Sequence, residues 1–491
     1  MSFLNAQQKE ASKTRTMNGA VTYSTTGNAC LDLFSCIGGM RYRSPRDQVR
    51  LFDKAYKENP ELAMKLLFYL RDIRGGMGER KSFRTLLRHV AKTYPTSAQK
   101  NVGFISEYGR FDDLLCLLGT PAEKEMVKVI KEQLEADLAA AKEKDAPISL
   151  LAKWLPSINT SSRDTRKKAL RLASLLGLSH YEYRKTLSYL RRKLFLPERL
   201  LTEKKPKNVC YHAVPSGAML KYRSAFLKKD SGRFQTYLQK VKANEEGMHA
   251  ATLFPYEILR PYFNEGRVRG KDVLEGLWAN LPKVEGNKNA ISVIDVSGSM
   301  YWQIQKGAIT PALLSQSLGI YHAENCEGPF HNHFITFSAR PELLEIHGNT
   351  LSQKLADIRR ADWGFNTNLE AVFELILRTA VKAGASQNEM PQVLYIISDM
   401  EFDKAVEDPG KTIYENAKTR FASFGYSLPA VVFINVNSFS MHAPVRARTR
   451  GSALVSGAGT GVFQHKFDGN ITPEKHMLRV LLGRRYEKIH A

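Results

Sequence analysis

The sequence is poor in cysteine and has no long apolar run, and these two absences exclude several classes of protein. Five of the 491 residues are cysteine, and no two of them form a CxxC pair. This excludes a disulfide-stapled miniprotein, a zinc ribbon and a thioredoxin-type redox site. No apolar run approaches the roughly 18–20 residues that a membrane-spanning helix needs. The first ten residues also lack the pattern of a secretory signal, so we expect a soluble, cytoplasmic protein with no membrane partner.

Common catalytic motifs are missing as well. The sequence contains no GxxxxGK(S/T) phosphate loop, no GxSxG elbow and no HExxH zinc motif. His331 and His333 would lie on one face of a strand, but no third ligand stands near them. We therefore expect that the protein is not an enzyme.

Positive charge is abundant and unevenly distributed. The chain has 72 Lys and Arg against 49 Asp and Glu, a formal net charge of +23. Residues 1–290 have 52 basic and 30 acidic side chains, whereas residues 291–491 have 20 and 19. Residues 161–240 alone have 20 basic and 5 acidic side chains, a net charge of +15. Such a local excess favours a polyanionic partner such as nucleic acid, although solvated helix faces are the simpler alternative.

The spacing of apolar residues changes near residue 286. Before it, apolar residues recur at helical spacing and are punctuated by Gly and Pro, which predicts an array of stacked helix pairs. After it, short apolar strands alternate with helices, which predicts a mostly parallel sheet. The predicted fold class is α + α/β, a HEAT-like helical repeat module followed by a Rossmann-like domain. The predicted divisions are an N-terminal segment (1–43), a helical domain (44–285) and an α/β domain (286–491), with a linker at 285–287.

Individual elements follow from the same patterns. In the first half we expect helices at 62–70, 79–92, 162–176 and 179–194. In the second half we expect strands at 290–294, 333–337, 393–397 and 430–434, and helices at 304–321, 369–377 and 473–482.

An acidic loop follows the first strand of the predicted α/β domain. Asp295, Ser297 and Ser299 are spaced two residues apart in the sequence DVSGS. Loops at the carboxyl edge of a parallel sheet bind ligands, and their carboxylate and hydroxyl oxygens suit Mg²⁺. Thr367 and Asp399 stand at the same edge in other loops. The alternative is that DVSGS only caps a helix.

This constellation resembles the metal-ion-dependent adhesion site (MIDAS) of von Willebrand factor A domains. The resemblance implies that a divalent cation is held, directly or through water, and that a carboxylate of a protein partner completes its coordination. The implied metal ligands are Asp295, Ser297, Ser299, Thr367 and Asp399.

The sequence departs from that pattern at two places. Asn366 stands where many such domains have a glycine-rich step, and Glu401 and Asp403 add carboxylates beside Asp399. A metal-dependent hydrolase that uses these three carboxylates is therefore an alternative interpretation.

Basic residues gather on the predicted helices between 162 and 229, interleaved with aromatic residues. A continuous cationic stripe would neutralise RNA phosphates, and exposed aromatic rings could stack on unpaired bases. The interleaved aromatic residues are Tyr181, Tyr183, Tyr189, Tyr211, Tyr222 and Phe226. The alternative is that Tyr183 and Phe226 belong to the core, which the helical phase supports for Tyr183. The basic residues expected to face RNA are Arg163, Arg166, Lys167, Lys168, Arg171, Arg184, Lys185, Arg191, Arg192, Lys193, Lys221, Arg223, Lys228 and Lys229.

Taken together, the chain resembles the Ro autoantigen, or TROVE, family. The segments LRDIRGG (70–76), YGRFDDLL (108–115) and LFP (253–255), with the acidic loop, carry this resemblance. It implies a ring of helical repeats closed by an A domain, which binds small structured RNAs outside and single-stranded RNA ends in its hole.

We therefore expect a non-enzymatic protein that binds small noncoding or misfolded RNA as a ribonucleoprotein. The alternative is an assembly module that grips a carboxylate of a protein partner through its metal site.

Overall fold

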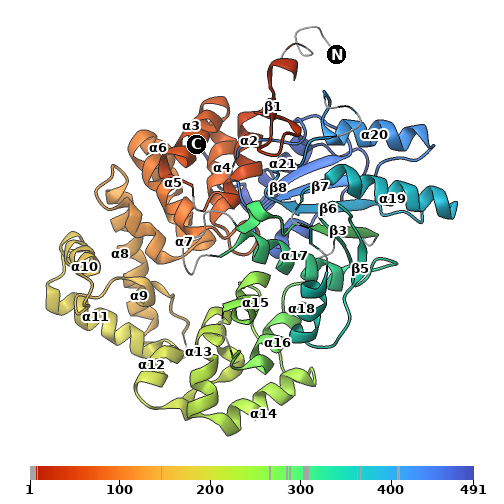
Figure 1. Ribbon diagram of the computed structural model, residues 1–491. Helices are drawn as coiled ribbons and strands as arrows, with labels where there is room; N and C mark the ends of the chain where they lie inside the picture. Colours follow the sequence, from red (N-terminus) through yellow and green to blue (C-terminus); the bar gives the residue numbers. More distant parts are fainter. Residues whose placement is uncertain are drawn as a thin grey trace.

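The structure is a computed structural model with a helical arc and an α/β part (Figure 1). It describes residues 7, 9–41, 43–144, 146–264, 267–283, 286, 289–301, 309–361, 363–364, 366–405, 408, 410–438 and 440–491. The ends of the predicted linker, residues 285 and 287, and the start of the predicted helix 304–321 lie outside these residues. The fold class predicted from the sequence, a helical array followed by a mostly parallel sheet, is confirmed.

The arc consists of helices that pack on one another largely in chain order. Its α-helices are α2 (Ala29–Cys36), α3 (Pro45–Glu58), α4 (Pro60–Arg71), α5 (Arg80–Thr93), α6 (Pro95–Asn101), α7 (Ile105–Tyr108), α8 (Glu123–Ala140), α9 (Leu151–Trp154), α10 (Arg163–Leu175), α11 (His180–Lys193), α12 (Pro197–Thr202), α13 (Ser216–Lys229), α14 (Ser231–Lys242), α15 (Pro255–Asn264) and α16 (Lys271–Ala279). A 3-10 helix, η3 (Phe111–Leu117), follows α7. None of the described helices is long and apolar enough to cross a membrane.

The helix boundaries follow from local chemistry. The Ser162 hydroxyl accepts a hydrogen bond from the backbone N–H of Thr165 and so begins α10. At α11, Ser179 and Glu182 form the predicted capping box. The predicted helices 62–70, 79–92, 162–176 and 179–194 correspond to α4, α5, α10 and α11, so these four predictions are confirmed to within a few residues.

The α/β part is built on one six-stranded sheet in the order β5-β4-β3-β6-β7-β8. Its strands are β3 (Ala290–Ile294), β4 (His333–Thr336), β5 (Leu343–Glu345), β6 (Val393–Ser398), β7 (Ala430–Asn435) and β8 (Ser452–Ser456). All neighbouring strands are parallel except β4 and β5. Counted from β3, this is the 3-2-1-4-5-6 order of doubly wound sheets, whose topological switch point lies between β3 and β6.

Helices cover both faces of the sheet. The α/β helices are α17 (Pro311–Asn325), α18 (Leu351–Arg360), α19 (Leu369–Ala383), α20 (Ile413–Ser423) and α21 (Pro473–Leu481). Ile294 and Leu318 of α17 share one hydrophobic cluster, whereas Val293 packs on the opposite face with residues of α19 and α20. The predicted strands and the closing helix are confirmed, but β5, β8, α18 and α20 were not predicted. The described part of the predicted helix 304–321 begins only at Pro311, because Thr310 caps it.

The N-terminal segment is attached to the α/β part. It forms a hairpin of β1 (Lys13–Arg15) and β2 (Val21–Tyr23), and Tyr23 and Ala443 exchange backbone hydrogen bonds of 3.0 and 2.8 Å. After α2, Gly38 lies so close to β8 that an added Cβ would be 2.7 Å from Ser456 and Gly457 backbone atoms. Only glycine allows this approach, and the described part of the predicted segment 1–43 is thus bound to the sheet.

The C-terminal tail makes the reciprocal contact. Residues 484–491 insert into the first helices of the arc, where Lys65 donates hydrogen bonds of 2.8 Å to the carbonyls of Tyr486 and Ile489. The fully buried Asp72 carboxylate accepts hydrogen bonds from Arg485 and from the Tyr486 hydroxyl, the latter at 3.0 Å. Burial alone would raise the pKa of Asp72, but the hydrogen bonds and charge of Arg485 lower it below its usual range.

The other end of the arc also rests on the α/β part. Trp278 of α16 donates a hydrogen bond of 2.8 Å to Glu324, and Glu275 accepts one of 2.9 Å from the backbone of Leu351. Hydrophobic clusters are shared across both junctions and so cross the predicted domain divisions. The arc therefore starts and ends on the α/β part, and Figure 1 shows the resulting closed circuit.

We predict that Asp72→Asn lowers the free energy of unfolding by about 1.5–3 kcal/mol, because it removes the charge of a buried carboxylate that accepts hydrogen bonds from the partly exposed Arg485. It should also increase hydrogen exchange in the C-terminal tail. Glu107→Gln, which breaks the exposed 3.9 Å ion pair to Lys488 of the same tail, should cost less than about 1 kcal/mol. Urea unfolding and hydrogen-exchange mass spectrometry test both variants, and equal effects would contradict the role given to Asp72.

Candidate functional site

Two carboxylates meet at the switch point of the sheet. Asp295 follows β3 and Asp399 follows β6, and these strands are parallel neighbours with Ile294 beside Ile397. Both side chains are buried, with 0% and 1% of their surfaces exposed. The structure therefore brings these two predicted residues together.

The Asp295 carboxylate is held by hydrogen bonds. Its Oδ2 accepts one of 2.6 Å from the Ser398 hydroxyl, and its Oδ1 accepts one of 2.8 Å from the backbone N–H of Ser297. The backbone N–H of Asp295 donates to the Ser315 hydroxyl of α17 at 3.0 Å. These contacts fix the start of the acidic loop in one conformation.

Hydroxyl groups and an unsatisfied oxygen complete this group. The hydroxyls of Ser297 and Ser299 lie 3.1 Å apart. Asp399 Oδ1 accepts a 3.2 Å hydrogen bond from the backbone N–H of Glu401. The Ser299 hydroxyl approaches the Asp399 carboxylate closely enough to lower its pKa, but no hydrogen bond of ordinary geometry from a described residue reaches the buried Oδ2. A buried carboxylate oxygen without a partner costs free energy, so an external donor or cation would be favoured there.

The electrostatics of the two carboxylates agree with this geometry. Burial raises the pKa of Asp295 to about 6. Burial, together with the charge of Asp295, raises the pKa of Asp399 to about 8. Within the described ranges, no Lys, Arg or His side chain pairs with either carboxylate. Burial of the carboxylate is the main physical cause of both shifts, and for Asp399 the like charge of Asp295 adds to it.

The donor set fits a hard divalent cation. It offers two carboxylates and two hydroxyls, all of them oxygen donors, and the unsatisfied Asp399 Oδ2 is among them. Mg²⁺ prefers oxygen ligands and needs few protein carboxylates because it keeps several waters. The described residues contain no group of three or more His, Cys, Asp or Glu that could hold a metal, so serine hydroxyls are essential to this candidate.

Thr367 lies in a neighbouring network. Its hydroxyl donates to the Glu401 carbonyl at 2.8 Å or to Asp403 Oδ1 at 3.0 Å, and it accepts from Asn18 Nδ2 at 3.0 Å. Asp403 Oδ2 also accepts from the backbone N–H of Thr367 at 2.9 Å. These contacts of Thr367 thus lead to Asp403, Glu401 and the N-terminal hairpin, and its role as a metal ligand stays a prediction.

The sequence did not predict that the turn of the N-terminal hairpin contacts the network around Thr367. Met17 donates its backbone N–H to Glu401 at 2.7 Å, and Asn18 Nδ2 also donates to the Glu401 carbonyl at 2.8 Å. Ser440 donates to the same Glu401 carboxylate. The dipeptide Asn18-Gly19 is a hairpin signal in the sequence, but nothing local shows where the hairpin docks. Glu401 and Asp403 hold the hairpin and Thr367, which does not favour the hydrolase interpretation.

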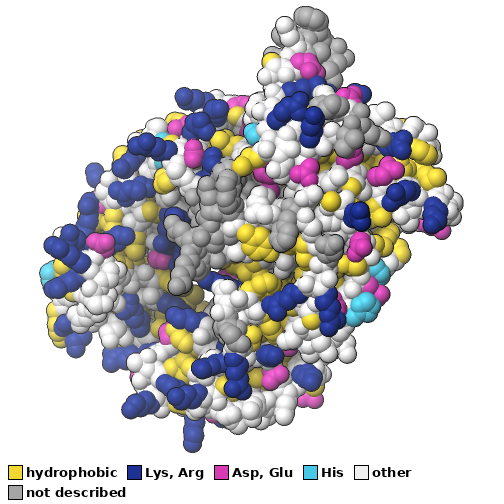
Figure 2. All heavy atoms as spheres, viewed as in Figure 1, with side chains coloured by type: hydrophobic (Ala, Val, Ile, Leu, Met, Phe, Trp, Pro, Cys, Tyr) yellow, Lys and Arg dark blue, Asp and Glu magenta, His cyan; other side chains and the backbone are white. Residues whose placement is uncertain are grey.

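Most of the predicted RNA-facing side chains are exposed. Figure 2 shows Lys and Arg side chains gathered along the edge formed by α10 to α14. Arg171 is exposed but pairs with Glu123 at 2.7 Å, and Lys229 donates to the Leu201 carbonyl at 3.1 Å. The remaining exposed ones are Arg163, Arg166, Lys167, Lys168, Arg184, Lys185, Arg192, Lys193, Lys221 and Lys228.

Two of the residues expected to face RNA donate hydrogen bonds to backbone carbonyls of the protein instead. The half-buried guanidinium of Arg191 donates to the carbonyls of Ala152 and Leu155 at 2.7 and 2.8 Å. Arg223 is only 9% exposed and donates to the carbonyls of Arg269 and Leu220 at 3.0 and 2.8 Å. The expectation that these two belong to the exposed face is wrong, because buried carbonyl groups take up their donors.

The aromatic residues also divide into two groups. Tyr183, Tyr211 and Phe226 are buried and belong to the core. Tyr181 is 60% exposed, and the Lys185 ammonium lies 5.3 Å from its ring centroid. Tyr181 is therefore available to stack on a base, whereas the three buried rings are not.

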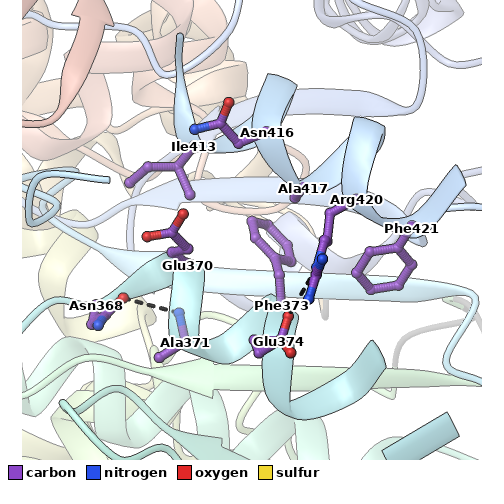
Figure 3. Close-up of a pocket in the computed structure, with 10 residues that line it drawn as sticks. All are labelled: Asn368, Glu370, Ala371, Phe373, Glu374, Ile413, Asn416, Ala417, Arg420 and Phe421. Atoms are coloured by element: carbon purple, nitrogen blue, oxygen red, sulfur yellow. Dashed lines mark hydrogen bonds and ion pairs between the residues drawn. The ribbon is translucent and has the colours of Figure 1, made fainter. Parts of the chain in front are cut away.

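A hollow of about 350 Å³ lies between α19 and α20 (Figure 3). Phe373 and Phe421 line it from the two helices, and Arg420 and Glu374 form an ion pair of 3.6 Å across it. Asn368 caps α19 at one end by accepting from the backbone N–H of Ala371 at 2.9 Å. This mostly apolar hollow contains none of the predicted site residues.

Comparisons with known proteins supply relatives without an assigned activity. Residues 289–481 match a family described as a domain of unknown function (DUF7788), and residues 16–133 and 161–281 match another (DUF2828). An uncharacterized protein of Acanthamoeba polyphaga mimivirus is 29% identical over 484 residues, which cover 90% of this chain and 82% of that protein.

One solved structure also aligns with most of the chain. It is the crystal structure of the Ro (RSR) protein of Deinococcus radiodurans, with 14% identity and a TM-score of 0.43, covering 88% of this chain and 92% of that chain. A similarity of this size carries no functional argument, so the relation to the TROVE family and to A domains stays a prediction.

We predict that Asp399→Asn stabilises the metal-free protein, because it removes a buried charge that Asp295 repels. In EDTA near pH 8 the free energy of unfolding should rise by about 1–3 kcal/mol. Since the folded-state pKa is raised, this gain should grow as pH rises from the ordinary Asp range toward about 8. Asp408→Asn, at a carboxylate that the Gly410 N–H stabilises, should give no gain. Urea unfolding at several pH values measures this, and a loss of stability in Asp399→Asn would contradict it.

Proposed function

We propose that this protein binds RNA without enzymatic turnover, through the cationic outer edge of its helical arc. The observation that carries the proposal is that the +15 segment folds into adjacent helices with many exposed Lys and Arg side chains, and that such side chains gather along the edge formed by these helices (Figure 2). Solvated helix faces would not need so strong an excess of one sign on adjacent helices. RNA is the polyanion that also suits an exposed tyrosine among the cations.

The recognition we propose is electrostatic and independent of base sequence. Roughly six to ten phosphate contacts could form along such an edge, which is about the number of its exposed Lys and Arg side chains without an ion-pair partner among the described residues. Contacts of this number would make the affinity for RNA fall steeply as the salt concentration rises. Stacking of an unpaired base on Tyr181 could add about 1–3 kcal/mol. Small structured noncoding RNA, misfolded RNA and single-stranded RNA ends are the proposed partners, as the resemblance of the sequence to the TROVE family implies.

We expect the triple charge reversal of Arg163, Arg166 and Lys167 to Glu to weaken RNA binding by about 10–100-fold near physiological salt. The matched control reverses Lys124, Lys128 and Lys131, three exposed lysines of α8, and should change affinity by less than about threefold. Fluorescence anisotropy with a labelled structured RNA measures both. Equal losses would mean that only net charge matters, and undetectable binding by the unaltered protein would refute the proposal.

We propose further that the α/β part binds a divalent cation, Mg²⁺ in the first place. Asp295 and Asp399 would hold it together with the hydroxyls of Ser297 and Ser299. The support is that the Asp399 carboxylate is buried beside the like-charged Asp295 and that its Oδ2 has no hydrogen-bond partner in the part of the chain that the structure describes. When bound, the cation supplies positive charge at the edge of the sheet, which a carboxylate of a protein partner could use. An assembly module that works in this way is the second candidate function.

Mg²⁺ should make the unaltered protein more stable than Asp399→Asn, which is the reverse of the order expected in EDTA. At a concentration of about 100 Kd, a ligand that binds only the folded state adds about 2.7 kcal/mol. The melting temperature of the unaltered protein and of Asp408→Asn should therefore rise with Mg²⁺ and fall back with EDTA. Asp399→Asn should show no such rise. A thermal-shift series with Mg²⁺, Mn²⁺ and Ca²⁺ is the test, and no response to any of them would exclude the cation site.

A further inference from the structure

A basic groove of about 520 Å³ lies between α5, η3 and α10. Five of the nine residues that line it are Lys or Arg, and none is acidic. Arg84 and Arg88 come from α5, whereas Lys167, Lys168 and Arg171 come from α10. Helices that are about 80 residues apart in the sequence thus direct cations toward one hollow.

The cations of this groove differ in how far they are neutralised. Arg84 pairs with Asp112 and Asp113 at 2.7 and 2.5 Å, and Arg171 pairs with Glu123. Among the described residues, Arg88, Lys167 and Lys168 form no ion pair. Three uncompensated positive charges therefore face the groove.

The Arg88 guanidinium is also fixed in place. Its Nη1 donates to the backbone carbonyls of Cys116 and Leu118 at 2.9 and 3.0 Å, which leaves its other N–H groups for a further acceptor. An arginine that is held in this way loses little side-chain entropy when it binds an anion.

The other lining residues do not supply the missing negative charge. Burial, with the charge of Asp113, raises the pKa of the Cys116 thiol to about 12, so this thiol is neutral near pH 7. Leu115 and Leu118 add an apolar wall. The groove therefore combines fixed positive charge with an apolar surface, which suits a phosphate joined to a sugar.

We propose that this groove binds a backbone phosphate of an RNA strand that continues over α10. Arg88 and Lys168 are the principal contacts. This proposal rests on the RNA-binding function above and deepens it, because it extends the path of the RNA from the 161–240 segment onto α5.

The test places a negative charge in the groove without removing any cation. Thr85 lines the groove, and its hydroxyl donates to the Lys81 carbonyl of the same helix at 3.1 Å, so no contact between helices depends on it among the described residues. Thr85→Glu introduces the charge, and Thr85→Gln is its neutral counterpart of similar size. Because Lys81 and Arg88 lie four residues before and three after, a glutamate at 85 is compatible with α5.

A matched control is available on α14. The exposed Thr236 makes the same type of hydrogen bond, to the Gly232 carbonyl at 3.1 Å, and also lies in the +15 segment. With a labelled single-stranded oligouridine, Thr85→Glu should weaken binding about tenfold and make the salt dependence shallower by about one phosphate contact. Thr85→Gln and Thr236→Glu should stay within about twofold.

The outcomes separate the groove from the proposed function. If Thr85→Glu weakens binding no more than Thr236→Glu or Thr85→Gln, the groove does not bind phosphate. If the α10 triple reversal weakens binding while Thr85→Glu does not, the groove proposal fails and the RNA-binding function stands. If the unaltered protein binds neither probe, both fail. Circular dichroism and urea unfolding confirm that each variant is folded.

Discussion

The buried carboxylate of Asp72 is the contact on which the arrangement of the whole chain depends. It joins the first helices of the arc to Arg485 and Tyr486, which lie more than 400 residues further along the chain. The N-terminal hairpin and α2 in turn pack on the sheet, whereas the C-terminal tail packs on the first helices of the arc. The helices in between connect these two fixed places and form the arc. The outward position of α10 and α11 follows from this closure.

The two candidate sites carry opposite kinds of electrostatic imbalance. On the arc, exposed cations exceed their neighbouring anions, so an anionic partner can approach from solvent. At the switch point of the sheet, two carboxylates are buried beside each other with one oxygen unsatisfied, so only something small enough to enter could compensate them. The first imbalance suits a large polyanion and the second a small cation. The two imbalances lie in separate parts of the molecule, so the RNA-binding and cation-binding proposals can be tested independently.

Several features could be predicted from the sequence because their causes are local. Central parallel strands are buried on both faces, so β3 and β6 appear as continuous apolar runs. The capping box of α11 needs only Ser179 and Glu182. The prediction missed β8, whose sequence SALVS has three apolar residues, because its burial comes from α2 and α21 packing on it. Arg191 and Arg223 were assigned to the surface since nothing in a sequence shows which carbonyl groups will lie beside a guanidinium.

By itself, the sequence determined the order of the helical and α/β parts, the uneven distribution of charge, and the loops that carry Asp295 and Asp399. These depend on periodicity, composition and short-range hydrogen bonding, which act over a few residues. Only the tertiary structure decided that the hairpin turn at Asn18 contacts Thr367, that Arg88 and Lys168 line one groove, and that the arc closes. These contacts join residues that are tens to hundreds of positions apart, and they depend on how the packed elements are oriented in space.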